Sequence, residues 1–476
     1  MPKPHIIVIY MDDLGYGDVG AYGATRVATP RIDALAAEGV RFTDGYATSA
    51  TCTPSRYALM TGRYPWRIDG AEILAGDAAL IIDPAEVTLP RMLSEAGYRT
   101  GIVGKWHLGL GSGDAPIDWN AQISPGPGDV GFDESFIMAA TQDRVPTVFI
   151  RDGFVVDADP NDPIDVDYET NFEGEPTALT HPEMVRMPWT HRHNDSIVNG
   201  IPRIGFMKGG TAARWVDEEI ADRLMDEAVE FIQRDRPEPF FLYLPLHQPH
   251  VPRTPHPRFA GSTGMGPRGD AIAEADWCVG RIVDALEEAG LRDDTLIIFT
   301  SDNGPVLDDG YQDGAIELAG DHRPAGPLRG GKYSLFDGGT RVPFIVSWPG
   351  VVEPQTSSAL VCQLDILASL AALVGSDAAS VDGENLSDAL LGRSPHGRRS
   401  LVLEAMTHTV FRAENWVLIP PSKGPEILAE TGIESGHSDQ YQLYDLGADI
   451  AETRNVAAEQ PDRTADLIAR YEEALR

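Results

Sequence analysis

The chain has 476 residues, of which 42% are hydrophobic and 23% are charged, and its formal net charge is -35. This length and composition are typical of a folded protein of enzyme size and argue against a disordered chain. The strong negative charge excludes a broad basic surface, so neither nucleic acid nor an anionic membrane is expected as a partner.

The N-terminal segment "HIIVIY" (5–10) predicts a strand. Only six apolar or aromatic residues precede two aspartates there. This run is too short for a membrane span or for the core of a signal peptide. We therefore expect a cytoplasmic protein, or a periplasmic or secreted one if a leader segment was removed.

Helical and strand patterns then alternate along the chain. The segment 29–39 predicts a helix, with Thr29 as its cap and Gly39 as its stop. Helix followed by strand recurs in 88–109, in 214–235 with 239–247, and in 270–304. This order predicts the α/β class, with a large, mostly parallel sheet covered by helices on both faces.

The alternation lapses over 109–212, a stretch rich in Pro, Gly, Asp and His. Such long irregular segments are usually lids or binding loops. The stretch 360–375 predicts the last helix of a main domain spanning residues 1–376. Shorter strands and a final helix from about Asp462 predict a C-terminal α+β subdomain over 377–476.

The opening of a short helix draws attention to Cys52, in "TCTPSRYALMTG" (51–62). Thr53 is a suitable N-cap, which would place Cys52 immediately before the helix. A helix N-terminus lowers the pKa of a thiol and attracts anions, and Arg56 adds a fixed cation. The alternative is a buried structural cysteine. Cys278 and Cys362 stand at unrelated spacings, so neither a disulfide framework nor a zinc site is expected.

Acidic and amide side chains follow two of the predicted strands. Asp12 and Asp13 follow the first strand, and Asp302 and Asn303 follow a late one. The carboxyl ends of strands in an open α/β sheet converge where ligands bind. Oxygen ligands without His or Cys favour Ca²⁺ or Mg²⁺ over Zn²⁺. The alternative is that both pairs form turns that cap the strand ends.

Basic side chains and imidazoles follow other predicted strands. Lys105 and His107 stand in "VGKWHLG", His247 and His250 in "LPLHQPHVP", and Lys332 on a Gly-rich loop. Each alone is more often a structural residue. Together with Arg56 and a metal, they supply what a tetrahedral anion needs for binding.

These segments carry a resemblance to a known family. "CTPSR" resembles the C-x-P-x-R signature of the type I sulfatases, in which the cysteine is oxidised to formylglycine. "DDLGYGD", "GKWHLG", "SDNG" and "GGTRVP" are similar to further segments of that family, in the same order, and the likeness covers nearly the whole chain. The resemblance implies the alkaline-phosphatase-like fold and the hydrolysis of sulfate esters.

The resemblance also implies a role for each matching residue. Cys52 would be the formylglycine precursor, converted by a formylglycine-generating enzyme and close to the metal. Ca²⁺, or alternatively Mg²⁺ or Mn²⁺, would be held by Asp12, Asp13, Asp302 and Asn303, and the sulfate charge by Arg56, Lys105 and Lys332. His250 would protonate the leaving alcohol and His107 would remove a proton from the second hydroxyl. His247 has no single implied role; acid, substrate contact and loop hydrogen bond all stay open.

The substrate is expected to be a small, lightly sulfated carbohydrate, because a chain of charge -35 repels polyanions. Bacterial sulfatases that act on sulfated carbohydrates resemble the chain around residues 301–336, although aryl sulfates remain an alternative. The candidate sugar contacts are His191, Arg192, His193, Asn194, Asp308 and Asp309, with a solvated loop as the alternative for each.

Two rival functions remain at this point. A phosphonate monoester or phosphodiester hydrolase of the same superfamily can share the formylglycine and the metal, although "GKWHLG" favours sulfate. A non-catalytic protein that binds sulfated glycans would need no acid and base pair, and the presence of His107 and His250 argues against it.

Overall fold

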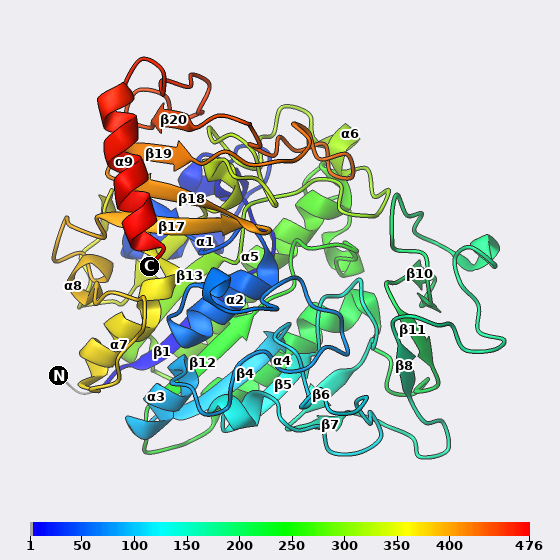
Figure 1. Ribbon diagram of the computed structural model, residues 1–476. Coiled ribbons are helices and arrows are strands. Elements are labelled where there is room, and N and C mark those ends of the chain that lie inside the picture. The colour runs from blue at the N-terminus through cyan, green and yellow to red at the C-terminus, as the bar shows by residue number, and fades with distance from the viewer. Residues whose placement is uncertain (1–2) are drawn as a thin grey trace.

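A ten-stranded sheet forms the centre of the computed structural model, which describes residues 3–476 (Figure 1). Its strand order is β15-β2-β14-β13-β1-β12-β4-β5-β6-β7. In that order, the strands span Gln355–Ser357, Val40–Phe42, Phe344–Ser347, Thr295–Ser301, His5–Met11, Phe240–Pro245, Arg99–Lys105, Glu134–Met138, Phe149–Arg151 and Phe154–Val155.

The middle of the sheet is parallel. β1 pairs in parallel with both β12 and β13, and β4 pairs in parallel with β12 and β5. The three central strands, β1, β12 and β13, carry long apolar runs, as expected for strands whose two faces are both covered by helices. The antiparallel partners, β14 beside β13 and β6 beside β5, lie outside this parallel centre. The predicted α/β class with a mostly parallel sheet is confirmed.

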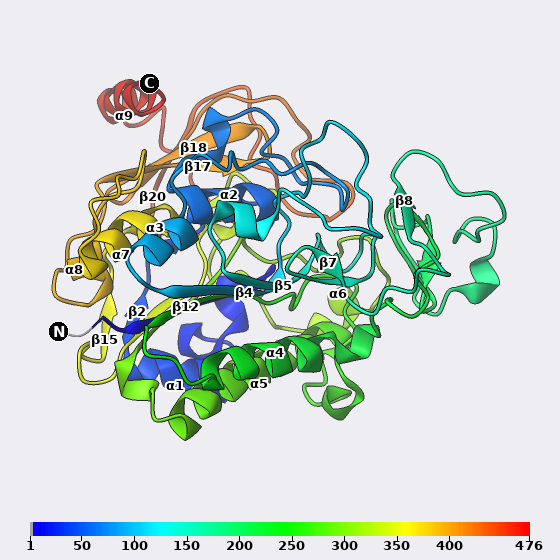
Figure 2. The same cartoon turned by 90° about the horizontal axis from the view of Figure 1, so that it is seen from below.

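Successive side chains of β1 enter two separate cores, as the two-residue period of a strand requires. Ile7 and Ile9 pack on one face, while Ile6 and Val8 pack on the other. Figure 2 shows the sheet edge-on between two helical layers. One layer holds α1 (Pro30–Glu38), α4 (Ile220–Gln233) and α5 (Gly266–Glu288); the other holds α2 (Cys52–Thr61), α3 (Leu89–Glu95) and α7 (Ile366–Val374).

The helix boundaries agree with the sequence in part. The first helix ends before Gly39, as predicted, and Pro30 opens it. α4 starts six residues later than the start of the predicted 214–235 segment, and α5 starts four residues before position 270. The stretch 360–375 first forms strand β16 (Val361–Cys362), which pairs with β3 (Gly45–Tyr46), and only then α7. No described helix is both long and apolar enough to cross a membrane.

The stretch 109–212 is less irregular than its sequence predicted. Three of its strands, β5, β6 and β7, extend the central sheet by backbone pairing, which composition does not reveal. Beyond them, two short antiparallel pairs lie to one side of the molecule (Figure 1). They are formed by β8 (Asp165–Asp167) with β11 (Phe206–Lys208), and by β9 (Ile197–Val198) with β10 (Ile201–Pro202).

A separate antiparallel sheet follows near the C-terminus. Its strands are β17 (Ser400–Ala405), β18 (His408–Ala413), β19 (Trp416–Ile419) and β20 (Gln442–Asp445). Helix α9 (Pro461–Ala474) packs on this sheet, while the short helices α6 (Ala315–Ala319) and α8 (Ser387–Leu390) belong to connections. Side chains of the small sheet share an apolar cluster with Ala50, Leu335 and Phe336, so it is anchored beside α2. The domain division at residue 376 stays a prediction.

Candidate active site

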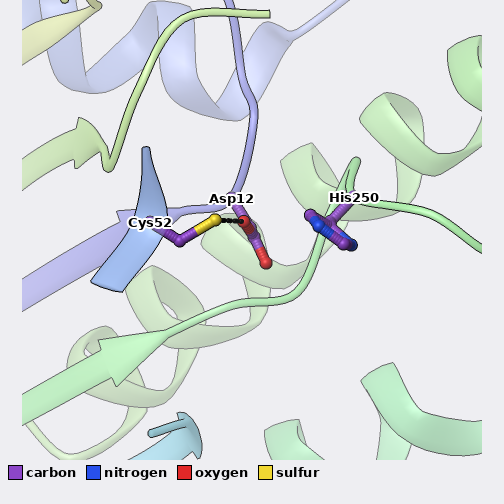
Figure 3. A group of neighbouring side chains, drawn as sticks. All are labelled: Asp12, Cys52 and His250. Atoms are coloured by element: carbon purple, nitrogen blue, oxygen red, sulfur yellow. Dashed lines mark hydrogen bonds between the residues drawn. The ribbon is translucent and has the colours of Figure 1, made fainter. Parts of the chain in front are cut away.

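Four strands of the central sheet end at one place. Asp12 follows β1, Lys105 ends β4, His250 follows β12 and Asp302 follows β13. These strands are neighbours with parallel pairing, so their carboxyl ends bring the four side chains together. In Figure 3, Asp12 lies between Cys52 and His250. The sequence predicted this convergence correctly.

Cys52 is the first residue of helix α2, not the residue before it. Thr51 adopts the extended conformation of an N-cap, with φ -146° and ψ 153°. The hydroxyl of Thr53 is occupied elsewhere, because it donates to the carbonyl oxygen of His107 at 3.0 Å. The predicted N-cap was therefore two residues too late, and Cys52 still stands in the first turn, where backbone N–H groups are free of helical partners.

The thiol of Cys52 is buried, with 1% of the residue exposed. Burial raises its pKa, although Lys105 and Lys332 act in the opposite direction. The expectation that the helix start lowers this pKa is therefore wrong, because the cost of burying a thiolate outweighs the nearby positive charges. The Sγ atom donates to Oδ1 of Asp12 at 3.7 Å. A thiol in this setting is not an activated nucleophile.

The carboxylates of Asp12, Asp13 and Asp302 form a buried group with Cys52, and their ligand atoms lie within 4.8 Å of one another. Asn303 donates from Nδ2 to Oδ1 of Asp13 at 2.7 Å, while its own Oδ1 is buried without a partner among the described residues. An orphaned oxygen beside three carboxylates fits a hard divalent cation, which prefers oxygen ligands. The residues present therefore fit the metal that the sequence predicted.

Three buried cations surround these carboxylates. Lys105 Nζ lies 2.7 Å from Asp12 Oδ2, and Arg56 Nη2 lies 2.6 Å from Asp302 Oδ2. Lys332 Nζ lies 2.9 Å from Asp13 Oδ2 and 2.7 Å from Asp309 Oδ2. Lys332 and Cys52 line the pocket described below, whereas Lys105 and Arg56 are fully buried and do not line it.

The carboxylates respond differently to this surrounding charge. Burial raises the pKa of Asp12 to about 8 against the opposing charge of Lys105. For Asp302, burial acts in the same direction, but Arg56 and Lys105 outweigh it and lower the pKa. A divalent cation held by both groups would favour the ionised form of each.

The two predicted acid and base histidines present opposite ring nitrogens to the site. His107 Nε2 contacts the carbonyl oxygen of Leu74 at 2.9 Å, while Nδ1 has no partner among the described residues. His250 Nδ1 contacts the carbonyl oxygen of Val251 at 2.6 Å, and its Nε2 lies 3.8 Å from Asp13 Oδ2. Since a carbonyl only accepts, Nδ1 of His107 and Nε2 of His250 are left for proton transfer. Burial lowers the pKa of both rings.

A pocket of about 630 Å³ opens from this cluster. Its inner wall includes Cys52, His107, His250 and Lys332. Of the candidate sugar contacts, His191, Arg192, His193 and Asp309 also line it. Asp309 accepts from Lys332 and from the Tyr333 hydroxyl, so its carboxylate is already engaged beside the metal ligands.

The remaining candidate contacts lie outside the pocket lining. Asp308 accepts from Thr190 and from the backbone of Gly310, which is a turn-stabilising arrangement. Asn194 donates its backbone N–H to the carbonyl of Arg192. His247 is buried behind the site, where burial lowers its pKa to about 3, and its Nδ1 has no partner in residues 3–476.

Several pocket residues carried no sequence signal. Asp143 and Arg144 follow β5, and His193 Nε2 lies 2.8 Å from Asp143 Oδ2. The pocket is also lined by Glu72 and by residues 406–407 and 428–431, which come from the C-terminal part of the chain. Recognising the strand at 134–138 would have drawn attention to Asp143, which follows it. No local sequence pattern predicts that residues 406–407 and 428–431 line the same pocket as Cys52.

The arrangement suits the hydrolysis of an ester of a tetrahedral oxyanion. Fixed cations and a divalent metal would stabilise the charge of the anion, and the free ring nitrogens of His107 and His250 could move protons beside it. The other cysteines, Cys278 and Cys362, are buried outside the pocket lining.

Comparisons with known proteins agree with this chemistry. A family model described as Sulfatase matches residues 4–376. An N-acetylgalactosamine-6-O-sulfatase of Bacteroides thetaiotaomicron is 50% identical over 469 residues, which cover 98% of this chain and 92% of that protein. Arylsulfatase A of Homo sapiens is 35% identical over 407 residues, covering 84% of this chain and 70% of that protein.

A solved structure gives the same result for the fold. It belongs to work on the metabolism of multiple glycosaminoglycans by Bacteroides thetaiotaomicron, is 49% identical, and matches with a TM-score of 0.98 over 100% of both chains. Identity and structural agreement of this extent cover the central sheet and the C-terminal sheet together.

Proposed function

The chain belongs to the sulfatase family and hydrolyses sulfate esters, and from this premise we propose that its substrate is a small sulfated carbohydrate. A 6-sulfated N-acetylhexosamine is the first substrate to test, because the relative that is 50% identical is an N-acetylgalactosamine-6-O-sulfatase. The observation that carries the proposal is the pocket that leads to Cys52, lined by both charged and apolar groups, as a sugar requires.

We propose Cys52 as the precursor of a formylglycine, made by a formylglycine-generating enzyme during maturation. The support is chemical: the buried thiol has a raised pKa and is a poor nucleophile as it stands. When present, the hydrated aldehyde supplies the hydroxyl that attacks sulfur. Arg56, which reaches the carbonyl oxygen of Lys105 and the carboxylate of Asp302, holds the surrounding elements in place.

We propose Ca²⁺ as the metal, held by Asp12, Asp13, Asp302 and Asn303. A divalent cation bound there would supply Lewis acidity. The oxygen-only ligands support Ca²⁺ or Mg²⁺ over softer metals.

The side chains of the chain itself then bind the anion and move protons. Lys332 and Lys105 offset the negative charge of the sulfate group. His250 in its doubly protonated form donates a proton from Nε2 to the departing sugar oxygen, because its Nδ1–H stays bound to the carbonyl oxygen of Val251. His107 accepts a proton at Nδ1, since its Nε2 is engaged by Leu74, and this proton transfer allows sulfate to leave.

The test combines mass spectrometry with sulfate release. The protein is produced with an active formylglycine-generating enzyme, and the peptide that holds Cys52 is weighed. The converted protein is expected to release sulfate from N-acetylgalactosamine 6-sulfate in the presence of Ca²⁺, and to act on an aryl phosphonate more slowly than on an aryl sulfate. An intact thiol despite active conversion, or preference for the phosphonate, would contradict the proposal.

A further inference from the structure

Two loops that are far apart in the sequence meet at the mouth of the pocket. We call residues 187–195 the insertion loop and residues 424–435 the C-terminal loop. His191, Arg192 and His193 of the insertion loop line the pocket, as do residues 428–431 of the C-terminal loop. Cys52 at the base is 1% exposed, whereas the Arg192 side chain is 73% exposed, so these loops form the outer end.

The insertion loop is held by backbone contacts. Thr190 donates its N–H to the carbonyl of Gly310 at 3.0 Å, and Gln312 donates to Pro188 at 2.9 Å. Gly310 has φ 109°, and a Cβ atom there would lie 1.9 Å from Nδ1 of His193, so only glycine allows this close approach. The position of the loop is therefore set by the chain segment after β13.

The C-terminal loop is held independently. It forms a small hairpin through the bridge between Ile427 and Glu434. Arg329 donates to both carboxylate oxygens of Glu434 at 2.8 Å, and Leu335 donates its N–H to the carbonyl of Ser435 at 2.8 Å. The base of the hairpin is thus fixed to Arg329 and Leu335, while residues 428–431 at its tip line the pocket.

Glu430 at this tip joins the two loops. Its Oε1 lies 3.2 Å from Nε of Arg192, and its Oε2 lies 4.0 Å from Nε2 of His191. Among residues 3–476, these contacts are the only ion pairs between 109–212 and 377–476. Since Glu430 is 48% exposed, the pair is screened by solvent and adds little to global stability. The effect of the ion pair is local, because it connects the two loops across the outer end of the pocket.

We infer that Glu430 and Arg192 are specificity-determining residues, whose ion pair closes the outer end of the pocket to a chain that continues beyond the sulfated sugar. The inference rests on the proposed function and deepens it. A terminal sulfated residue enters with the pair intact. An internal one requires the two loop tips to separate, because the flanking sugars must pass between them.

The experiment compares two substrates for each variant. One is N-acetylgalactosamine 6-sulfate, and the other is an oligosaccharide that carries the same residue internally as its only sulfated unit. The readout is the ratio of kcat/KM for the internal substrate to that for the monosaccharide. The ratio cancels any loss of catalysis that affects both substrates equally.

Glu430→Lys places a positive charge beside Arg192 and His191 and drives the loop tips apart. We expect the ratio to rise by about fivefold or more, and Arg192→Glu to act in the same direction. The double variant Arg192→Glu with Glu430→Lys restores an opposite-charge pair and is expected to return the ratio to within about twofold of the unaltered protein. Glu459→Lys, which makes the same charge change at the surface pair with Arg454, is the matched control and leaves the ratio unchanged.

An unchanged ratio in Glu430→Lys would overturn the inference. So would a double variant whose ratio rises by the product of the rises in the two single variants, because the restored pair would then have no effect. So would an equal rise in Glu459→Lys, since net charge alone would then explain it. Failure of the proposed function would look different, because the unaltered protein would release no sulfate from the monosaccharide. Glu430→Gln, which removes the charge with little change of shape, gives a smaller rise and covers the case in which the lysine variant folds poorly.

Discussion

Arg56 and Asp302 form a buried ion pair in which Nη2 and Nε of the guanidinium lie 2.6 Å and 3.2 Å from the same carboxylate oxygen. Neither side chain is exposed to solvent. The pair joins the helix that begins with Cys52 to the end of β13, and Arg56 also donates to the carbonyl oxygen of Lys105 at 3.3 Å. One side chain therefore ties three elements of the site together.

Replacing Arg56 with lysine should destabilise the protein strongly. A single ammonium group keeps the positive charge but cannot reach the Asp302 oxygen and the Lys105 carbonyl at once, and losing hydrogen bonds to buried charged groups costs about 1.5–3 kcal/mol. We expect Arg56→Lys to lose about that free energy of unfolding in urea. Arg454→Lys, at an exposed pair, should stay within about 0.5 kcal/mol of the unaltered protein. Equal urea midpoints for the two variants would contradict this reading.

Removal of the divalent cation should destabilise the fold, and the size of this effect should depend on Asn303 if Asn303 is a metal ligand. A ligand that binds only the folded state at 100 times its Kd adds about 2.7 kcal/mol of stability. We expect Ca²⁺ to raise the Tm of chelator-treated protein, and Asn303→Ala to reduce that rise, because the orphaned Oδ1 is a predicted ligand. Asn161→Ala, in a surface turn, should keep the full Ca²⁺ response. A full response in Asn303→Ala would remove Asn303 from the ligand set.

The sequence predicted most of the base of the site because its chemistry lies at strand ends. Asp12, Lys105, His250 and Asp302 each follow a recognisable apolar run, and parallel pairing brings such ends together. Local sequence patterns were therefore sufficient to predict that these four residues lie close together. The boundary of helix α2 was missed by two positions because the Thr53 hydroxyl is bound to a residue 54 positions away.

The outer part of the pocket could not be predicted in this way. Asp143 follows β5, which lies in a stretch whose composition resembles a loop, and Glu430 belongs to a hairpin near the C-terminus. Their meeting with Cys52 depends on packing between segments far apart in the chain. The raised pKa of the Cys52 thiol was missed for the same reason, because burial is a property of the tertiary structure.

Glu404 should make stability depend on pH. Burial, and then the charge of Glu72, raises its pKa from 4.5 to about 8, and its Oε2 has no partner in the described residues. Because the folded state holds this proton more tightly, Glu404 stabilises the fold fully below pH 4.5, and this contribution is lost as the pH rises to about 8.

Glu404→Gln removes this titration with little change of shape. We expect its Tm to exceed that of the unaltered protein at alkaline pH and to approach it at acidic pH. Thermal unfolding across this pH range measures the difference, with Glu353→Gln at the surface as the control. A constant offset between Glu404→Gln and the unaltered protein at every pH would show that Glu404 does not titrate as argued.

The proposed acid role of His250 predicts a dependence on the leaving group. A sugar alkoxide is a poor leaving group and needs a proton as the ester bond breaks, whereas a nitrophenolate leaves without one. General acid catalysis contributes about 10²–10⁴-fold, so His250→Ala should lower kcat on a sugar sulfate by that factor and on nitrophenyl sulfate far less. His247→Ala is the matched control, because His247 is an equally buried histidine outside the pocket lining. Its effect, if any, should be equal for both substrates. Equal losses in His250→Ala would instead assign His250 to binding the sulfate group, which both substrates share.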